Sequence, residues 1–310
     1  MSPKTKIKVI GVGGSGGNAL NRMSRAKIDR VELVAINTDF QDLKKIKADH
    51  KIQIGEKTTR GLGTGMDSLL GKKAALETKE KIEKVLAGSD MVFITCGMGG
   101  GTGTGASPVI AELAKKAGIL TVGIVTSPFS FEGIQRAKNA QRGISELKNK
   151  VDSLVVISND NLLSLIDKET SLLDAFWICD DVLRQAVKGI SELISQRGIV
   201  NVDFADVKTI LRNSGCALFG IGKAKGENRV AEAVNKAISS PLTETKIEKA
   251  NGVLFNVAGK NLSLFEIKDI ANLIKSKIDS KAKIIFGAKE MEKFPDDSIE
   301  LTLLVTGFNN

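Results

Sequence analysis

The chain has 310 residues, of which 42% are hydrophobic and 26% charged, with a formal net charge of +9 at pH 7. This length favours two domains, and no apolar run approaches the ~18 residues that span a bilayer. The lysines are dispersed through helix-like segments such as Lys72 to Lys84 and Lys275 to Lys283, Tyr is absent and His50 is the only histidine, which disfavours base-stacking nucleic-acid modules and catalysis by a histidine base.

Apolar runs alternate with amphipathic segments of helix length through the first half of the chain. This alternation is typical of an α/β fold with a doubly wound parallel sheet. The predicted buried strands are Ile7 to Gly11, Val31 to Ile36, Met91 to Cys96, Ile119 to Thr126 and Leu154 to Ser158. We therefore expect a Rossmann-like domain over residues 1–170, with its ligand at the carboxyl ends of the strands.

A long helix follows this domain. Apolar residues recur at three- and four-residue spacing from Leu172 to Ile194, which predicts a central connecting helix over residues 171–196 that ends at Arg197-Gly198. The rest, residues 197–310, alternates again and favours a smaller α/β domain with a mixed sheet. Its predicted elements are Phe204 to Leu211, Gly215 to Ile221, Arg229 to Ser239, Gly252 to Val257, Leu264 to Lys277, Ile284 to Gly287 and Ile299 to Thr306.

The three cysteines, Cys96, Cys179 and Cys216, lie far apart in apolar contexts. They are expected to be reduced core thiols rather than a disulfide or zinc framework. The N-terminus shows no signal-peptide pattern. A soluble cytoplasmic protein is therefore expected.

Two glycine-rich stretches each link a predicted strand to a predicted helix. They are Gly11-Val12-Gly13-Gly14-Ser15-Gly16-Gly17-Asn18 and Gly97-Met98-Gly99-Gly100-Gly101-Thr102-Gly103-Thr104-Gly105. Glycine lets backbone N–H groups face an anion, and the following helix adds the positive end of its dipole. The pair predicts a cradle for nucleotide phosphates.

The first stretch by itself also fits two simpler roles. Gly11-x-Gly13-x-x-Gly16 matches the dinucleotide fingerprint, with Glu32 or Asp39 as ribose contact, and it equally suits a plain strand-to-helix turn. A dinucleotide fold does not require the second stretch, and no P-loop lysine follows either one.

Polar residues after the glycine stretches offer further contacts. Thr102 and Thr104 offer hydroxyls to phosphate oxygens or to a water on Mg²⁺, or they cap the following helix. Glu132 and Arg136, four apart on the helix predicted after Pro128, would share one face, either as a surface pair or as ribose and phosphate contacts.

Asp180 lies on or beside the apolar face of the long helix, next to Phe176 and followed by Asp181. Because a buried carboxylate is costly without a donor, one of the two should have a partner. Guanine offers adjacent N1–H and N2–H donors, and a Ser, Arg or backbone donor is the alternative. Asn159 could add a further amide contact.

The segment Asn201-Val202-Asp203-Phe204-Ala205-Asp206 carries two carboxylates one turn apart. Structurally, Asp203 suits a helix N-cap and Asp206 the third helical position. Phosphoryl transfer also needs a group that orients the attacking water. The distance along the chain from the glycine stretches favours a role at the nucleotide of a neighbouring subunit.

These motifs resemble those of the tubulin/FtsZ family, and specifically the bacterial-type FtsZ cell-division GTPases. The resemblance covers nearly the whole chain, and its glycine-threonine signature with the Asn-x-Asp-x-x-Asp segment is highly specific. It rests on Lys8 to Asn18, Ala35 to Asp39, Asp90 to Ile94, Gly97 to Gly105, Pro128 to Gly133, Ser171 to Phe176 and Asn201 to Val207.

The resemblance implies a site for GTP or GDP. Glu132 and Arg136 would meet the ribose, and Asn159, Phe176 and Asp180 would frame guanine. The remaining implied nucleotide contacts are Gly13, Gly14, Ser15, Gly16, Gly17, Asn18, Asn37, Gly65, Gly100, Gly101, Thr102, Gly103 and Thr104. The implied catalytic residues are Asn201, Asp203 and Asp206, which would complete the site of the next protomer in a head-to-tail filament.

The resemblance also implies a cellular setting. The protein would polymerise with itself into the cytokinetic ring at the division site, with Mg²⁺ held mainly by phosphates and water rather than by a protein metal site. Membrane-tethering division proteins would be partners, although the usual C-terminal docking peptide is absent after Gly307-Phe308-Asn309-Asn310. Nucleic-acid binding and direct membrane insertion are not expected.

Some positions depart from the usual pattern of this family. Ser15 replaces a frequent glycine, the loop from Arg60 to Asp67 lacks a proline-containing run, and Trp177 and Ile178 stand where small residues are common. The altered loop motivates one alternative, a GTP-binding filament scaffold with little hydrolysis. The other alternative is an NAD-dependent oxidoreductase and rests on the dinucleotide fingerprint alone.

Overall fold

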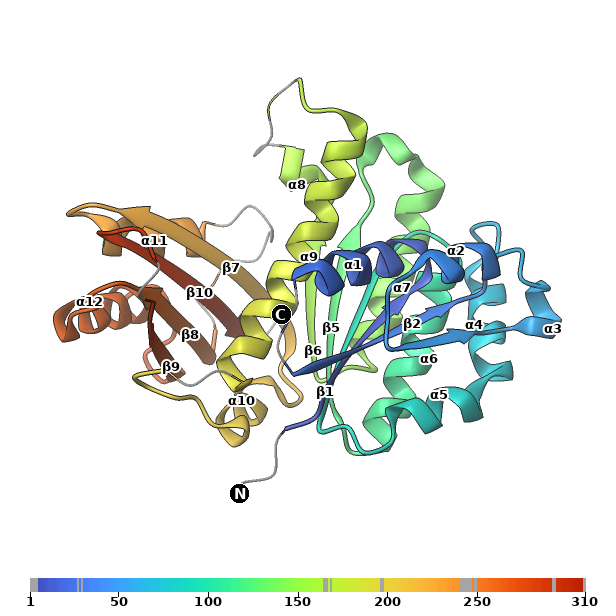
Figure 1. Cartoon of the computed structure of the whole chain (residues 1–310), viewed down its shortest axis with the longest axis horizontal. Coiled ribbons are helices and arrows are strands. Elements are labelled where there is room, and N and C mark those ends of the chain that lie inside the picture. The colour runs from blue at the N-terminus through green and yellow to red at the C-terminus, as the bar shows by residue number, and fades with distance from the viewer. Residues whose placement is uncertain are drawn as a thin grey trace. The chain divides into compact units, whose positions relative to one another are not determined.

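The computed structural model describes residues 5–26, 28, 30–163, 167, 169–195, 198–239, 247, 250–291 and 294–308 (Figure 1). The chain forms two compact units, Met1–Ser191 and Glu192–Asn310, and each is taken by itself below. The domain boundary predicted between Gln196 and Arg197 lies outside the described residues.

The first unit is built on a parallel sheet with strand order β3-β2-β1-β4-β5-β6. The strands are β1 (Ile7–Val12), β2 (Val31–Asn37), β3 (His50–Gln53), β4 (Met91–Gly97), β5 (Leu120–Ser127) and β6 (Ser153–Ser158). Strand β4 is buried from Met91 to Cys96, as a continuous apolar run covered on both faces requires. The predicted doubly wound sheet is confirmed, and its strand order switches between β1 and β4, where such sheets bind ligands.

Helices cover this sheet, and two of them meet at unusually short range. The helices are α1 (Gly13–Ala26), α2 (Phe40–Lys45), α3 (Glu56–Thr59), α4 (Ser68–Glu77), α5 (Lys79–Leu86), α6 (Thr102–Lys116), the 3₁₀ turn η1 (Ser130–Glu132), α7 (Ile134–Lys148), α8 (Asn159–Leu163) and α9 (Leu172–Ser195), whose last four residues belong to the second unit. A Cβ at Gly105 of α6 would lie 1.9 Å from the carbonyl oxygen of Ser68 in α4. The last glycine of the second stretch therefore serves helix packing.

The second unit contains a smaller mixed sheet of order β7-β10-β8-β9. Strand β10 runs antiparallel to β7 and β8, and β8 runs parallel to β9. Its elements are α10 (Phe204–Leu211), β7 (Gly215–Lys225), α11 (Arg229–Ile238), β8 (Gly252–Gly259), α12 (Leu264–Lys275), β9 (Lys283–Glu290) and β10 (Ser298–Thr306). The predicted mixed sheet is confirmed.

Helices α11 and α12 are joined by one ion pair as well as by the apolar core of this unit. Ser263 and Glu266 form a capping box at the start of α12. Nε of Arg229 donates to Glu266 at 2.6 Å, and this hydrogen bond holds the pKa of Glu266 below its usual range.

Three local predictions differ from the structure. Strand β3 was not predicted, because it has four residues and only Ile52 is buried, which leaves no periodicity to detect. The segment from Lys72 to Lys84 is two helices, separated at Thr78. The segment from Lys275 to Lys283 is not one helix, because α12 ends at Lys275 and β9 begins at Lys283.

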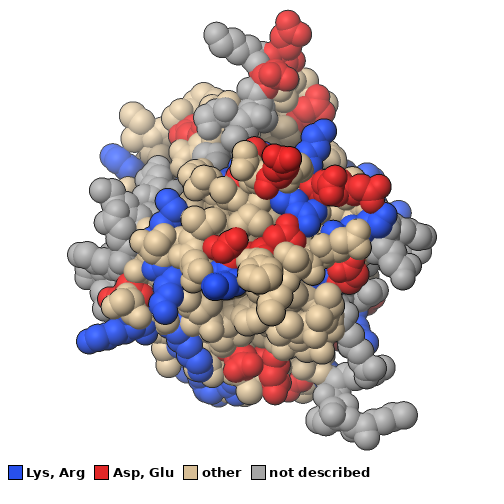
Figure 2. Space-filling view, turned by 90° about the vertical axis from the view of Figure 1, so that its left-hand side faces the viewer, with Lys and Arg blue, Asp and Glu red and all other residues tan. Residues whose placement is uncertain are grey.

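On the face shown in Figure 2, basic and acidic side chains are interspersed among uncharged ones. None of the described helices combines the length and apolar character needed to cross a bilayer.

Candidate functional site

A cavity of about 410 Å³ opens at the carboxyl ends of the parallel strands in the first unit. This volume is within the usual range of small-molecule sites. The predicted nucleotide contacts that line it are Gly13, Gly14, Ser15, Asn18, Gly100, Gly101, Thr102, Gly103, Glu132, Arg136, Asn159, Phe176 and Asp180. The chain thus brings both glycine stretches and the start of the long helix to one cavity.

Two helix N-termini open at this cavity. Strand β1 ends at Val12 and α1 begins at Gly13, while α6 begins at Thr102. Gly13 has φ of 70°, and a Cβ there would lie 3.2 Å from the backbone nitrogen of Gly103, so the two glycine stretches adjoin. The unpaired N–H groups and positive dipole ends of two helices favour an anion here.

A small network of hydroxyl groups lies under the second stretch. Oγ1 of Thr102 is 2.6 Å from Oγ1 of Thr38 and 3.3 Å from Oγ1 of Thr64. The N-cap of α6 is Gly101, without a side-chain cap, so neither predicted threonine caps this helix. Oγ1 of Thr104 instead accepts a hydrogen bond from the N–H of Gly99 at 2.9 Å. This bond stabilises the conformation of the second glycine stretch.

The predicted contacts that do not line the cavity are Gly16, Gly17, Asn37, Gly65 and Thr104. A Cβ at Gly16 would lie 2.6 Å from a carbonyl oxygen of β4, and a Cβ at Gly17 would lie 2.7 Å from a side-chain carbon of the residue after α2. Both glycines therefore allow α1 to pack closely. Asn37 donates at 2.9 Å to Asp42 of α2, and Gly65 lies in the loop before α4 with φ of 54°.

Glu132 and Arg136 come together, but they do not share one helix. Glu132 ends the turn η1, and Gly133, with φ of 101°, separates it from α7. The prediction that both lie on one helical face is wrong because this glycine breaks the helix. Nε of Arg136 still lies 3.1 Å from Oε2 of Glu132, although this buried nitrogen lacks the alignment of a hydrogen bond.

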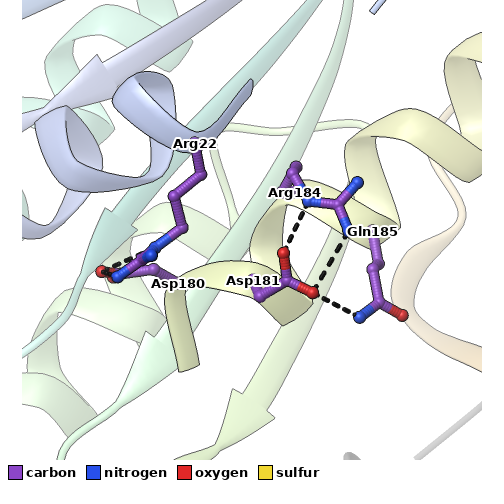
Figure 3. A network of polar contacts seen from close by, with 5 residues as sticks. All are labelled: Arg22, Asp180, Asp181, Arg184 and Gln185. Carbon is purple, nitrogen blue, oxygen red and sulfur yellow. Dashed lines mark hydrogen bonds and ion pairs between the residues drawn. The ribbon is translucent and has the colours of Figure 1, made fainter. Parts of the chain in front are cut away.

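Asp180 is 7% exposed and has an arginine partner (Figure 3). Nε and a terminal nitrogen of Arg22 donate to Oδ2 of Asp180 at 3.3 and 3.1 Å. The guanidinium also lies 4.9 Å from the ring centre of Trp177. No group of the described residues donates a hydrogen bond to Oδ1 of Asp180, which leaves an acceptor for a ligand.

Burial governs the ionisation of Asp180. Removal from water raises its pKa to about 6, although the hydrogen bonds and charge of Arg22 act in the opposite direction. Its neighbour Asp181 behaves differently, because Arg184 and Gln185 donate to it at 2.6 and 2.7 Å. Burial raises the pKa of Asp181, but these hydrogen bonds outweigh burial and lower it overall.

Phe176 and Asn159 are the other two residues that were expected to contact the nucleotide base. Phe176 is 38% exposed, and its ring stands edge-on to Phe129 at 5.5 Å between centres. Oδ1 of Asn159 is buried and accepts no hydrogen bond within the part of the chain that is described. A planar ligand with a donor group would satisfy both residues.

The acidic segment belongs to the second unit. Oδ1 of Asn201 accepts from the N–H of Gly198 at 2.8 Å, and Oδ1 of Asp203 accepts from the N–H of Ala205 at 3.4 Å. Asp203 is thus the N-cap of α10, as its position before the predicted helix indicates. Asp206 follows in the first turn, and no hydrogen bond or ion pair from the described residues reaches its carboxylate.

Sequence reasoning missed several residues of the cavity and its supports. Thr64, Thr126, Pro128 and Cys179 also line the cavity, as do Val12, Gly97 and Met98, which belong to the predicted glycine stretches but were not named as contacts. Arg22 and Asn139 are linked to the site by hydrogen bonds. Strand-end positions would have indicated Val12, Gly97 and Thr126, whereas nothing local distinguishes Arg22.

The thiols differ in exposure. Cys96 and Cys179 are buried and Cys216 is half-buried. Burial raises the pKa of Cys96 and Cys179 to about 12, so little thiolate is present at neutral pH.

We expect Ellman's reagent to modify one thiol per native chain and three after denaturation, and Cys216→Ser should remove the native reaction. Rapid native labelling of that variant would contradict the buried positions.

Comparisons with known proteins agree with these motifs. Residues 6–167 match the model of the Tubulin/FtsZ family, GTPase domain, and residues 215–309 match the FtsZ family, C-terminal domain. The chain is similar to an empty FtsZ dimer from M. jannaschii, with 46% identity, TM-score 0.93, and coverage of 99% of this chain and 89% of that one.

More distant structures share the fold. CetZ2 from Haloferax volcanii, solved as a GTPγS-bound protofilament, has 20% identity, TM-score 0.80, and coverage of 97% and 92% of the two chains. CetZ1 from the same organism, a GDP-bound monomer, has 22% identity, TM-score 0.81, and coverage of 99% and 95%.

Proposed function

The chain belongs to the tubulin/FtsZ family of GTPases, and from this premise we propose that its first unit binds GTP in the cavity and that hydrolysis occurs between protomers of a head-to-tail filament. The observation that carries the proposal is the lining of the cavity. It combines two helix N-termini, which suit phosphates, with the carboxylate of Asp180 and the unpaired oxygen of Asn159, which suit a base with several donors.

Asp180 supports guanine over adenine. Guanine presents N1–H and N2–H side by side, and Oδ1 of an ionised Asp180 has two lone pairs that accept both while Oδ2 serves Arg22, whereas N1 of adenine is itself an acceptor and would face the carboxylate without a proton. Phe176 offers a ring against the base. Glu132 and Arg136 suit the ribose hydroxyls and the phosphates. Within this proposal, Gly13 to Ser15 and Gly100 to Gly103 hold the phosphates.

Hydrolysis needs a group that orients water toward the γ-phosphate. Among the described residues that line the cavity, the only carboxylates are those of Asp180 and Glu132, which are proposed to hold the base and the ribose. We assign the role to Asp203 and Asp206, with Asn201, in the next copy. A heterologous contact of this kind does not close and generates a polymer, so assembly and hydrolysis become coupled.

Mg²⁺ fits this site as a companion of the phosphates. No group of three or more acidic, histidine or cysteine side chains that could hold a metal occurs among the described residues. The hydroxyls of Thr64 and Thr102, which line the cavity, would offer oxygens to the ion or to its water ligands. Mg²⁺ commonly keeps water and phosphate oxygens as ligands. When bound, it would neutralise phosphate charge, while the glycine N–H groups orient the phosphate chain.

The cellular role follows from family membership. We propose that residues 1–170 act as the nucleotide-binding domain, residues 171–196 as the connecting helix and residues 197–310 as the domain that activates hydrolysis. Filaments would form the cytokinetic ring at the division site, held there by membrane-tethering partner proteins.

Phosphate release measured against protein concentration tests this function. If the site is completed by a neighbour, turnover per chain rises with concentration and reaches a plateau once filaments form. Turnover that stays flat would contradict the shared site. A plateau near zero in filaments that sediment with bound GTP would instead support the scaffold alternative.

Guanine binding should weaken in acid. Because the base requires ionised Asp180, whose pKa is about 6, affinity is full above this pH and falls as the pH drops through it, approaching ten-fold per unit. Guanosine is the suitable probe, because phosphate groups also titrate near pH 6. An affinity that stays constant from pH 7.5 to 5 would exclude Asp180 as the base acceptor.

A further inference from the structure

Asn139 of α7 is a buried polar residue for which the proposed function so far gives no role. It is 6% exposed. Its Nδ2 lies 3.2 Å from the carbonyl oxygen of Met66, 3.1 Å from that of Gly99 and 3.0 Å from that of Gly100. Two amide protons serve three acceptors, and only the nitrogen can donate to carbonyls, so this network fixes the orientation of the side chain.

Two of these carbonyls control where backbone N–H groups point. In a trans peptide unit the C=O and N–H groups point in opposite directions. The carbonyl of Gly99 shares its unit with the N–H of Gly100, and the carbonyl of Gly100 shares its unit with the N–H of Gly101. Neither N–H donates a hydrogen bond to an atom of the described residues, and both glycines line the cavity.

The third carbonyl belongs to the other loop at this end of the cavity. Met66 lies in the loop from Arg60 to Asp67 and has φ of 68°. Thr64 of the same loop lines the cavity, with its hydroxyl 3.3 Å from that of Thr102. Asn139 therefore ties this loop to the glycine stretch through a single amide group.

Helix α7 has little freedom to carry Asn139 elsewhere. A Cβ at Gly143, one turn further along α7, would lie 2.3 Å from Cγ2 of Thr104. A Cβ at Gly99 would lie 2.7 Å from Cγ of Arg136. The absence of side chains at these two glycines lets the helix sit directly on the loop, which keeps the amide within reach of the carbonyls.

We propose that Asn139 is a positioning residue for phosphate binding. Its amide turns the N–H groups of Gly100 and Gly101 toward the phosphate chain and joins the loop from Arg60 to Asp67 to them. This inference rests on the proposed function, because the anion that it serves is the phosphate chain of a guanine nucleotide.

Calorimetric titration of the full chain with GDP and with guanosine tests the proposal. Asn139→Leu removes the donors at similar volume and leaves the N–H groups of Gly100 and Gly101 without a fixed direction. The Kd for GDP should rise about ten-fold, as expected when one or two hydrogen bonds from these N–H groups to phosphate are lost. The Kd for guanosine, which has no phosphate, should change less than two-fold. Asn139→Gln, which keeps a donor amide, should recover part of the GDP affinity.

The matched control is Asn149→Leu, the same change at the exposed C-cap of α7, which should leave both affinities unchanged. If Asn139→Leu fails to fold, Asn139→Asp, of the same shape, takes its place and should lose GDP affinity more strongly because a carboxylate would face carbonyl oxygens. Wild-type protein that binds no GDP would overturn the proposed function itself. Normal GDP affinity in the Asn139 variants, or equal losses for GDP and guanosine, would overturn this inference alone.

Discussion

Replacing Asp206 with alanine should lower GTP hydrolysis about 10²- to 10³-fold, the usual cost of removing one group that acts on the transition state, while GTP binding stays intact. Asp206 suits this test because no hydrogen bond or ion pair from the described residues reaches its carboxylate. Asp203 is a poorer choice, since it caps α10 and its loss would also destabilise the helix, by about 1 kcal/mol. Phosphate release and GTP binding are measured on the same preparation.

Glu232→Ala is the matched control, because Glu232 is an exposed acid in the first turn of α11 in the same unit. It should keep wild-type turnover. Asp206→Ala with unchanged turnover would show that this carboxylate does not take part in hydrolysis.

A mixing experiment separates a shared site from an internal one. Asp180→Ala impairs the nucleotide cavity but keeps the acidic segment, and Asp206→Ala does the reverse. Each variant alone should be nearly inactive. If the site forms between protomers, a mixture regains activity wherever an intact cavity meets an intact acidic segment, which is about a quarter of the contacts for random head-to-tail order. A mixture as inactive as its components would place the whole site within one chain.

The parts of this site that were predictable from sequence are those that local pattern determines. All strands of the first unit except β3 are mainly apolar runs, and both glycine stretches follow a strand directly, so their meeting at one sheet edge follows from parallel topology. The first turn of α10 was likewise predictable, because an Asp before a helix is a strong N-cap signal.

Other parts depend on contacts that no local pattern carries. Arg22 and Asp180 are 158 residues apart in the chain, and Arg22 looks like any polar residue of an amphipathic helix. From the sequence, Asn139 is indistinguishable from an exposed amide, and only the packing of α7 shows that it is buried. The separation of Glu132 from α7 depends on Gly133, whose φ of 101° is visible only in the fold. Tertiary packing, rather than propensity, decides these positions.

Asp180→Asn should change which purine nucleotide the protein prefers. Asn keeps only one carbonyl oxygen, which Arg22 requires, so its amide nitrogen would face the N2 amino group of guanine, donor against donor. The Kd for GTP should rise at least about 100-fold, because charge-assisted hydrogen bonds contribute roughly 1.5–3 kcal/mol each. Xanthosine triphosphate carries an oxygen in place of that amino group, so the amide pairs with it and the variant should prefer this nucleotide.

Asp181→Asn is the matched control, since Asp181 stands next in the same helix but binds Arg184 and Gln185 (Figure 3). It should keep the preference for GTP. Titration of wild type and both variants with the two triphosphates gives the ratio of affinities, and a ratio is insensitive to a general loss of stability. If Asp180→Asn still prefers GTP, a group other than Asp180 selects guanine, and Oδ1 of Asp180 does not bind the base. A reversed ratio in Asp180→Asn alone would identify this carboxylate as the element that selects guanine.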